Sequence, residues 1–334
     1  MNADLVNPPY DPELMANLQF PPPILTDDDF KQWRSMLSVD EVERDRGLRA
    51  LFGQFDLSYE DRTVPTPEGD VILGIVRPQG SENRTLPVLY DIHGGGMILG
   101  TRHTTLVPER LQWAADHGLV LITPEYTLAP EARAPRAAME CYSALLYLTG
   151  HPEEFMIDPS RIILSGISGG GGLAASVGLL VRDKGGPQLL GQLLNCPQLE
   201  DRHQTPSSYQ FSAERGAIDS WVRETNIYAW NALLGEGHEE REVSVYESPA
   251  RAEDLRGLPQ TFIDVGGCEV FRDAGIAYAS KLYAGGVSTE LHVWPGGYHG
   301  YETFAAEAPV SIQTREARTK WLARVLATSS SGQE

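Results

Sequence analysis

The sequence predicts an α/β fold with a mostly parallel central sheet, helices on both faces of that sheet and a helical cap. Short apolar runs of strand length alternate with windows of helical periodicity along most of the 334 residues, which is typical of a parallel sheet covered on both sides. Residues 1–55 and 197–250 fall outside this alternation, so we expect them to form cap segments. Residues 56–196 and 251–330 are expected to form one main domain, because α/β folds with an inserted lid reach this length with a single core.

Seven strands are expected from apolar or alternating runs that are bounded by turn residues. The run at 71–76 follows a turn at Pro67-Glu68-Gly69, and the run at 86–92 has the apolar character of a buried strand. The other strands are expected at 119–123, 162–165, 189–194, 260–265 and 289–294. In open α/β sheets of this kind, ligands bind outside the carboxyl ends of the strands.

Helical periodicity predicts five helices between and after these strands, at 108–117, 137–148, 170–182, 273–284 and 312–326. The first cap segment contains Pro21-Pro22-Pro23 and then an acidic, helix-prone stretch, and the second contains an aromatic helix at 221–234. Both segments are candidates to cover the carboxyl ends of the strands. Their aromatic side chains would line an apolar pocket there or form the core of the cap: Trp33, Tyr209, Phe211 and Trp221.

Composition and charge exclude several classes of function. The chain has 27 Lys and Arg against 46 Asp and Glu, and 27 − 46 gives a net charge of −19, which repels nucleic acids and anionic bilayers. No stretch approaches the ~20 apolar residues of a membrane span, and the first residues lack the pattern of a signal peptide. The three cysteines lack the clustered spacing of a metal site or a disulfide framework. We therefore expect a cytoplasmic protein with no nucleic-acid partner.

A histidine and three glycines, His93-Gly94-Gly95-Gly96, directly follow the expected strand at 86–92. In acyl transfer, negative charge develops on the former carbonyl oxygen, and residues without a Cβ let backbone N–H groups close around it. Each such donor is worth about 10²–10³ in rate. We assign Gly94 and Gly95 as donors of an oxyanion hole. A flexible glycine turn between a strand and a helix is the alternative interpretation.

The segment Gly166-Ile167-Ser168-Gly169-Gly170 has the pattern of a nucleophile elbow. Glycines two residues before and two after Ser168 permit the tight strand-to-helix turn that holds a serine strained and exposed. The N–H of Gly169 would be a third oxyanion donor. One alternative is a helix start with a capping serine. Another is a dinucleotide loop, but the strand that follows ends in Asn195-Cys196-Pro197 and lacks the acid that such a loop requires.

A serine hydroxyl needs a base to take its proton, and the base needs an acid to fix its tautomer. His299 is the expected base, because it follows the last strand and comes after the serine in the chain order Ser, acid, His. Three acids are candidates: Glu269, Asp264 and Asp273. Glu269 is favoured because it lies in the loop past a strand, whereas Asp264 is still within that strand and Asp273 has the position of a first-turn helix acid.

With these motifs, the chain resembles the hormone-sensitive lipase family of α/β-hydrolases over roughly residues 55–327. Four segments carry the resemblance, in the family's order: His93-Gly-Gly-Gly96, Glu125-Tyr-Thr-Leu-Ala-Pro-Glu131 with Pro135, Gly166-Ile-Ser-Gly-Gly170, and Phe271-Arg272-Asp273-x-Gly275-x-x-Tyr278 leading to Tyr298-His299-Gly300. The resemblance implies an α/β-hydrolase fold and gives each matching residue a role: Ser168 as nucleophile, His299 as base, Glu269 as acid, and Gly94, Gly95 and Gly169 as oxyanion donors.

The chain departs from the family pattern at Ile167, Gly169 and Glu269, where the family usually has Asp or Thr, Ala and Asp. A glutamate can do the work of the aspartate from one methylene further away. We therefore expect a serine-dependent carboxylic-ester hydrolase that acts on a small-molecule ester with no metal or cofactor. The alternatives are an amide or formamide hydrolase with the same triad, and a non-catalytic ligand receptor, although receptors resembling this family typically lose the base. The resemblance is also compatible with a homodimer.

Overall fold

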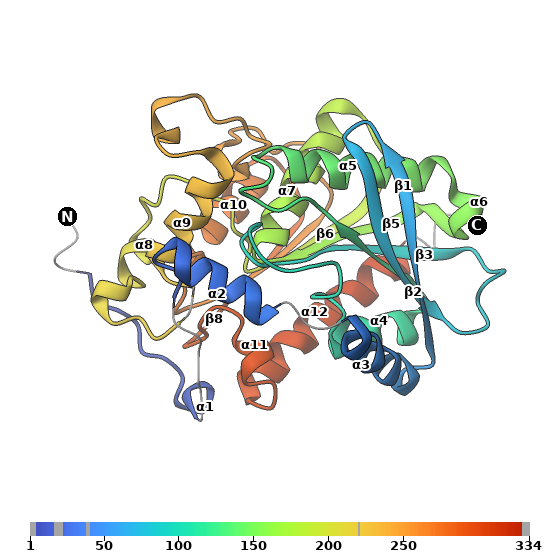
Figure 1. Cartoon of the computed structure of the whole chain (residues 1–334), viewed down its shortest axis with the longest axis horizontal. Helices are drawn as coiled ribbons and strands as arrows, with labels where there is room; N and C mark the ends of the chain where they lie inside the picture. Colours follow the sequence, from blue (N-terminus) through green and yellow to red (C-terminus); the bar gives the residue numbers. More distant parts are fainter. Residues whose placement is uncertain (1–4, 17–22, 38–40, 220, 329–334) are drawn as a thin grey trace.

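An eight-stranded sheet with the order β1-β2-β4-β3-β5-β6-β7-β8 forms the centre of the computed structural model, which describes residues 5–16, 23–37, 41–219 and 221–328 (Figure 1). Strand β2 is antiparallel to β1 and to β4, and the other neighbouring pairs are parallel. This confirms the expected α/β fold. The strands are β1 (Leu57–Thr66), β2 (Gly69–Pro78), β3 (Leu86–Ile92), β4 (Val120–Glu125), β5 (Ile157–Ile167), β6 (Leu189–Asn195), β7 (Thr261–Gly266) and β8 (Thr289–Trp294).

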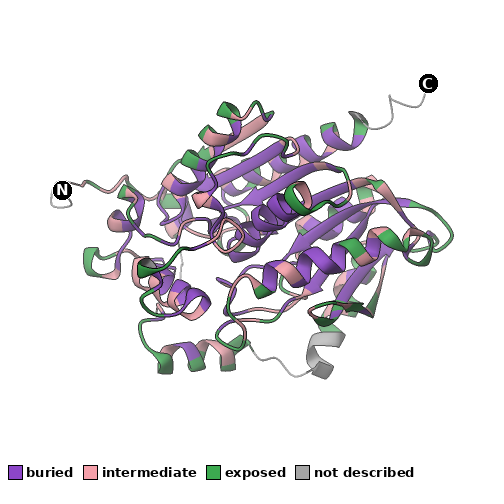
Figure 2. Ribbon diagram, turned by 90° about the horizontal axis from the view of Figure 1, so that it is seen from above, coloured by how far each residue is buried: buried purple, intermediate pink, exposed green. Residues whose placement is uncertain are grey.

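Helices cover both faces of the sheet. Alternate strand residues point to opposite sides, so the apolar side chains on each face are buried under helices. Phe262 of β7 packs in one apolar cluster with Trp113 and Leu322, whereas Ile263 packs in the other with Ala144 and Val177. Figure 2 shows the sheet and the inner helix faces buried. One face carries α3 (Glu41–Gln54), α4 (Pro108–His117) and α12 (Pro309–Thr328), and the other carries α5 (Arg136–Gly150), α7 (Gly169–Lys184) and α10 (Arg272–Ala284).

Strand β1 is not among the strands expected from the sequence, and its place in the sheet explains why. Most of its residues are partly or fully exposed, it contains Pro65, and it lies at the edge of the sheet, where it pairs only with β2. An edge strand needs no continuous apolar pattern, so the run has little of the signal that marks the buried strands. Strand β5 likewise begins at Ile157, five residues before the expected start, in a stretch where polar residues precede the apolar run.

The two expected cap segments contact each other beyond the carboxyl edge of the sheet. Helix α2 (Asp27–Leu37) lies beside α9 (Arg223–Leu234), with the rings of Phe30 and Tyr228 5.5 Å apart (Figure 1). Helix α3 of the first segment instead packs on β1 through the stacked rings of Phe52 and Tyr59. The division of the chain into cap and main domain stays a prediction. The remaining short helices are α1 (Pro12–Met15), α6 (Pro152–Phe155), α8 (Pro206–Gln210), α11 (Tyr301–Phe304) and the 3-10 turns η1 (Ala213–Arg215), η2 (His238–Glu240) and η3 (Pro249–Arg251).

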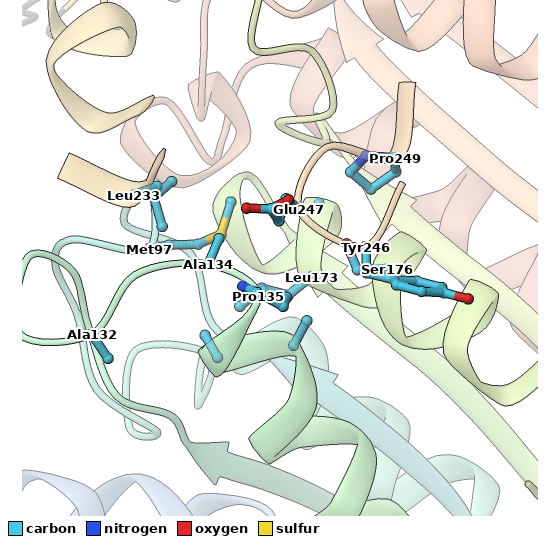
Figure 3. Close-up of a pocket in the computed structure, with 13 residues that line it drawn as sticks. Met97, Ala132, Ala134, Pro135, Leu173, Ser176, Leu233, Tyr246, Glu247 and Pro249 are labelled. Atoms are coloured by element: carbon cyan, nitrogen blue, oxygen red, sulfur yellow. The ribbon is translucent and has the colours of Figure 1, made fainter. Parts of the chain in front are cut away.

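A pocket opens where α9 meets α5 and α7 (Figure 3). Its lining is mostly apolar and includes Met97 from the loop after β3, Leu173 from α7 and Leu233 from α9. Gly172, one turn along α7 from Ser168, also lines it. The pocket therefore lies close to the end of β5. No helix in the described parts of the chain is long and apolar enough to cross a membrane.

Candidate active site

Ser168 lies in the turn between β5 and α7, at the carboxyl edge of the sheet. Its backbone has φ 58° and ψ −121°, a region that residues other than glycine rarely adopt. Its N–H donates to the carbonyl of Asn195 at 2.8 Å, and its own carbonyl accepts a hydrogen bond from the N–H of Gln198 at 3.0 Å. The end of β6 therefore holds the serine in this strained conformation.

The glycines on either side of Ser168 are required by close backbone packing. A Cβ on Gly166 would lie 2.2 Å from the carbonyl oxygen of Gly170, and a Cβ on Gly170 would lie 2.0 Å from that of Ile92. Such approaches are far shorter than van der Waals contact, so a side chain on Gly166 would open the turn itself and one on Gly170 would force the turn away from β3. The sequence pattern around the serine thus reflects the geometry of this turn.

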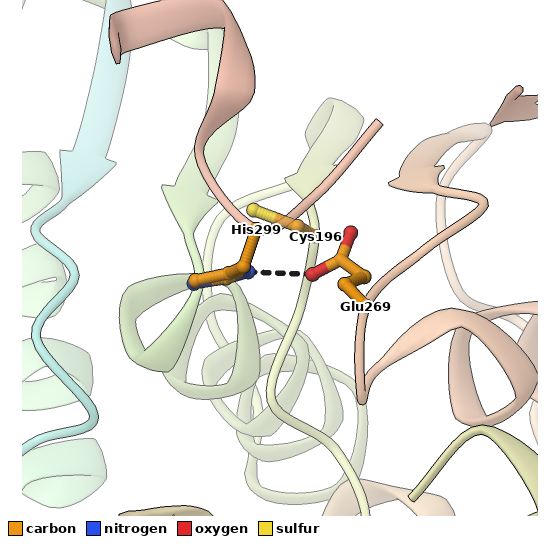
Figure 4. A group of neighbouring side chains, drawn as sticks. All are labelled: Cys196, Glu269 and His299. Atoms are coloured by element: carbon orange, nitrogen blue, oxygen red, sulfur yellow. Dashed lines mark hydrogen bonds and ion pairs between the residues drawn. The ribbon is translucent and has the colours of Figure 1, made fainter. Parts of the chain in front are cut away.

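His299 connects Ser168 to Glu269 in one chain of hydrogen bonds. Its Nε2 lies 2.9 Å from Oγ of Ser168, and its Nδ1 lies 2.5 Å from Oε2 of Glu269 (Figure 4). A carboxylate can only accept, so Nδ1 carries the proton and Nε2 is left to accept from the serine hydroxyl. Oε1 of Glu269 accepts from the N–H of Gly266 at 2.5 Å, which fixes the carboxylate. The structure brings these three predicted residues together from three separate loops.

The other two candidate acids are committed to partners other than His299. Asp264 is buried within β7 and accepts hydrogen bonds from Arg318 Nε at 2.7 Å and from Asn195 Nδ2 at 2.9 Å. Asp273, in the first turn of α10, accepts from the N–H of Ser207 at 2.7 Å. Of the three carboxylates considered from the sequence, Glu269 is therefore the one positioned beside the imidazole.

Burial and neighbouring groups set the protonation of this site. Burial acts to lower the pKa of His299, whereas the charge of Glu269 and its hydrogen bond act to raise it, and the net pKa lies well above its ordinary value of 6.5. Burial raises the pKa of Glu269, against the lowering effects of His299 and of the Gly266 N–H. Burial also raises the pKa of the Cys196 thiol to about 12, so this thiol is protonated at neutral pH. Glu269 is then the charged partner of the imidazole.

The structure places Gly94 and Gly169 where the loop after β3 meets the turn at the serine, whereas Gly95 packs on Leu99 of its own loop. A Cβ on Gly94 would lie 2.9 Å from the carbonyl oxygen of Ile167, and a Cβ on Gly169 would lie 2.9 Å from Cα of Gly96. The backbone of the glycine loop therefore lies directly against the serine turn.

His93 and a neighbouring segment brace the glycine loop. The His93 ring stacks on Tyr126 at 4.1 Å, and the Tyr126 hydroxyl donates to the His93 carbonyl at 2.9 Å. Burial lowers the pKa of His93 to about 4, so the ring is neutral. The N–H of Ala129 donates to the carbonyl of Met97 at 2.9 Å. The Glu-Tyr-Thr-Leu-Ala-Pro-Glu stretch, which has no catalytic explanation in the sequence, thus supports the loop that carries the three glycines.

Residues 89–303 match a protein family described by the α/β-hydrolase fold. The chain belongs to this α/β-hydrolase family. A solved bacterial heroin esterase has a TM-score of 0.83 and 36% identity, covering 95% of this chain and 98% of that chain. The esterase LipW from Mycobacterium marinum has a TM-score of 0.82 and 26% identity, with 96% and 98% covered. Carboxylesterase NlhH of Mycobacterium tuberculosis is 34% identical over 228 residues, 68% of this chain and 70% of NlhH. These relatives confirm the resemblance to α/β-hydrolases of the hormone-sensitive lipase type.

Two residues close to His299, Cys196 and Asp219, are not among the site residues predicted from the sequence. Cys196 has its sulfur within 4.8 Å of ligand atoms of Glu269 and His299 (Figure 4). Its place directly after β6, the strand next to β5, is a signal that could have found it. Asp219 accepts a hydrogen bond from the backbone N–H of His299. No local pattern marks Asp219, because its approach depends on how residues 197–250 fold over the sheet.

The four aromatic residues considered for a pocket take different places in the α/β-hydrolase. The ring of Trp221 has its centroid 6.3 Å from that of His299, so it lies at the site. Phe211 is buried in the core, and the ring of Tyr209 packs under a guanidinium group at 4.1 Å. Trp33 is partly buried against the main apolar cluster. Trp221 is therefore the aromatic residue of this set that contacts the base.

A thiol, a carboxylate and an imidazole, which are common metal ligands, lie together at Cys196, Glu269 and His299. Their hydrogen bonds show whether these groups are free to bind a metal. Both ring nitrogens of His299 are engaged, one by Ser168 and one by Glu269. The bonding of this cluster fits proton transfer better than metal binding.

Proposed function

We propose that the protein is a serine-dependent carboxylic-ester hydrolase that works through an acyl-enzyme on Ser168. The observation that carries the proposal is the hydrogen-bonded chain from Ser168 Oγ through His299 to Glu269, with links of 2.9 Å and 2.5 Å. The similar proteins named above are a carboxylesterase and esterases, which supports the ester as substrate class. The sequence-based predictions of a homodimer and of a cytoplasmic location stay predictions.

In the acylation step, Oγ of Ser168 attacks the ester carbonyl carbon while its proton passes to Nε2 of His299. The carbonyl electron pair moves onto the oxygen, where the N–H groups of Gly94, Gly95 and Gly169 stabilise the negative charge. When the tetrahedral intermediate collapses, the bond to the alcohol breaks and the imidazolium returns its proton to the leaving alkoxide. The product of this step is an alcohol and an ester of Ser168.

In the deacylation step, His299 takes a proton from water, and the resulting hydroxide attacks the acyl carbon. Collapse of the second intermediate breaks the bond to Ser168 Oγ, which regains a proton from the imidazolium, and a carboxylic acid leaves. Glu269 holds the proton on Nδ1 in both steps and stabilises the imidazolium by its charge. Ester and water are consumed, and alcohol and acid are formed.

We propose that the substrate chain lies toward the narrow apolar pocket next to the elbow. A Cβ on Gly169 would lie 2.8 Å from the backbone nitrogen of Met97, and a Cβ on Gly172 would lie 3.6 Å from its Cε, so Met97 reaches from the serine turn into the pocket (Figure 3). Met97 is 5% exposed and already occupies part of this space. We therefore expect short apolar chains to fit better than long ones.

The test of this function compares esters with matched amides. Hydrolysis of p-nitrophenyl esters of graded acyl length is measured beside the corresponding p-nitroanilides, for the wild type and for Ser168→Ala. We expect the wild type to cleave the short esters fastest, and Ser168→Ala to lose this activity. Ester hydrolysis that persists in Ser168→Ala, or faster turnover of the anilides, would contradict the proposal.

A further inference from the structure

Asp219 joins the second cap segment to the loop of the base. It precedes α9 in the chain, and its side chain is buried. Its Oδ2 accepts a hydrogen bond from the backbone N–H of His299 at 2.7 Å. Its Oδ1 accepts another from the backbone N–H of Trp221 at 3.0 Å. A single carboxylate thus connects two backbone segments that are 80 residues apart.

Trp221 extends this connection to the glycine loop. A Cβ on Gly96 would come within 2.1 Å of Cη2 of Trp221, so the indole packs directly on that glycine. The same indole lies 6.3 Å from the imidazole of His299, centroid to centroid. The turn that Asp219 caps therefore contacts both the base and the loop that carries Gly94 and Gly95.

The carboxylate of Asp219 also places a buried negative charge near the base. This charge contributes to the raised pKa of Glu269, after the larger effect of burial. Charges act strongly on one another where little water screens them. In each step of the reaction, His299 takes a proton and becomes a cation. A carboxylate that accepts from the backbone N–H of His299 is expected to stabilise this imidazolium more than the neutral ring.

We propose that Asp219 is a positioning residue for the base, which fixes the His299 loop through its backbone amide and stabilises the imidazolium by its charge. The inference rests on the proposed ester hydrolysis. Asp219 touches neither the serine nor the substrate in this account, because it acts through His299. It also ties the cap segment to the reaction, since a displacement of the turn at Trp221 would move the imidazole.

The other titratable groups near His299 and Asp219 keep the same charge near pH 7. A substitution of Asp219 therefore changes the charge of that residue alone. Glu302 has a lowered pKa because Arg318 offsets its burial, so it stays ionised in every variant considered below. The thiol and phenol groups have raised pKa values, and burial keeps them neutral near pH 7. Among the described residues, the titratable groups that act on these two residues include Glu269, Cys196, Glu302, Tyr298 and Tyr10.

Three variants separate the charge of Asp219 from its hydrogen bonds. Asp219→Asn removes the charge and keeps the shape but only one of the two acceptor oxygens, and Asp219→Ala removes the charge and both acceptors. Asp27→Asn is the matched control, because Asp27 is an exposed acid of α2 that accepts from the hydroxyl of Tyr228. The kcat/KM for p-nitrophenyl acetate is measured from about pH 5 to 10, the range in which a perturbed histidine titrates. Thermal unfolding shows that each variant is folded.

For Asp219→Asn we expect the acidic limb of the profile to move to lower pH by about one unit, because the imidazolium loses a stabilising charge. The plateau of kcat/KM should fall about tenfold, which corresponds to one pKa unit of imidazolium stabilisation. Asp219→Ala should show the same shift with a larger fall, and Asp27→Asn should match the wild type.

An unchanged acidic limb in Asp219→Asn overturns the inference even if the plateau falls, because a purely structural contact would lower the rate equally at every pH. If Asp219→Asn does not fold, Asp219→Ser removes the charge, keeps an acceptor and decides the same comparison. A wild type that hydrolyses no ester at any pH would instead overturn the proposed function. The two failures are thus distinguishable.

Discussion

Arg318 Nε donates to Oδ2 of Asp264 across 2.7 Å in the interior of the protein, directly below the site. The same guanidinium donates to Glu302 at 2.9 Å, in the helix that follows His299. Asp264 in turn accepts from the side chain of Asn195, whose carbonyl holds the N–H of Ser168. Buried ion pairs thus connect the serine turn with the loop of the base.

Replacement of Arg318 by Met should destabilise the fold strongly. It leaves the carboxylates of Asp264 and Glu302 buried with no cation between them, which costs about 3–5 kcal/mol. The matched control is Arg324→Met on the same helix, where an exposed pair with Glu290 is worth less than about 1 kcal/mol. The free energy of unfolding in urea measures both. Equal effects of the two substitutions would show that the buried ion pairs do not hold the site together.

Ser168→Ala and His299→Ala should act as parts of one unit. Each should lower kcat by about 10⁴–10⁶, and the double variant should lower it little further, because neither residue works without the other. Steady-state kinetics on one p-nitrophenyl ester checks this, with circular dichroism as the control for folding. Losses that multiply in the double variant would mean that the two residues act independently.

Glu269→Gln should lower kcat by about 10⁴, because the amide can donate to Nδ1 and so favours the wrong tautomer of His299. Glu269→Asp keeps the charge and should retain part of the activity. Asp264→Asn is the comparison, because Asp264 binds Arg318 and should affect unfolding more than kcat. The assignment of the acid would be wrong if Asp264→Asn reduced kcat as much as Glu269→Gln in folded protein.

The pH dependence follows from the direction of the His299 pKa. The base accepts a proton only when it is neutral, so kcat/KM should rise with pH as the imidazolium loses its proton. Because the pKa of His299 is raised above its ordinary value of 6.5, the midpoint of this rise should lie above pH 6.5 and the plateau should be reached at alkaline pH. A pH profile of kcat/KM measures the midpoint. A midpoint at or below 6.5 would show that burial outweighs the neighbouring carboxylate.

The buried elements are the part of the fold that the sequence predicts best. The buried strand at 86–92 and the helix at 108–117 have the predicted bounds, because apolar patterns and adjacent turn residues mark both ends. The strand at 289–294 also has its predicted bounds, although it lies at the edge of the sheet and is only partly buried. Strand β1 lacks that pattern, since its edge position leaves most of its side chains in contact with solvent. The periodic signal is therefore strongest where a segment is covered on both sides.

The site residues likewise fall into those that a local sequence pattern marks and those that it does not. The turn at Ser168 could be predicted because it requires glycines at fixed spacing, and the place of Glu269 because a loop after a strand reaches the carboxyl edge; the oxyanion role of the three glycines stays a prediction. Asp219 could not be predicted, because its carboxylate meets the His299 N–H only after residues 197–250 have folded over the sheet. Contacts that form only when a cap segment folds over the sheet have no sequence motif or periodicity by which they could be predicted.

Trapping of the covalent intermediate tests the central claim most directly. The protein is treated with a fluorophosphonate, which phosphonylates an activated serine, and the modified peptide is located by mass spectrometry. We predict one equivalent of label on Ser168, complete loss of ester hydrolysis, and no labelling in Ser168→Ala or His299→Ala. Label on a different serine, or hydrolysis that continues after Ser168 is fully modified, would contradict the account.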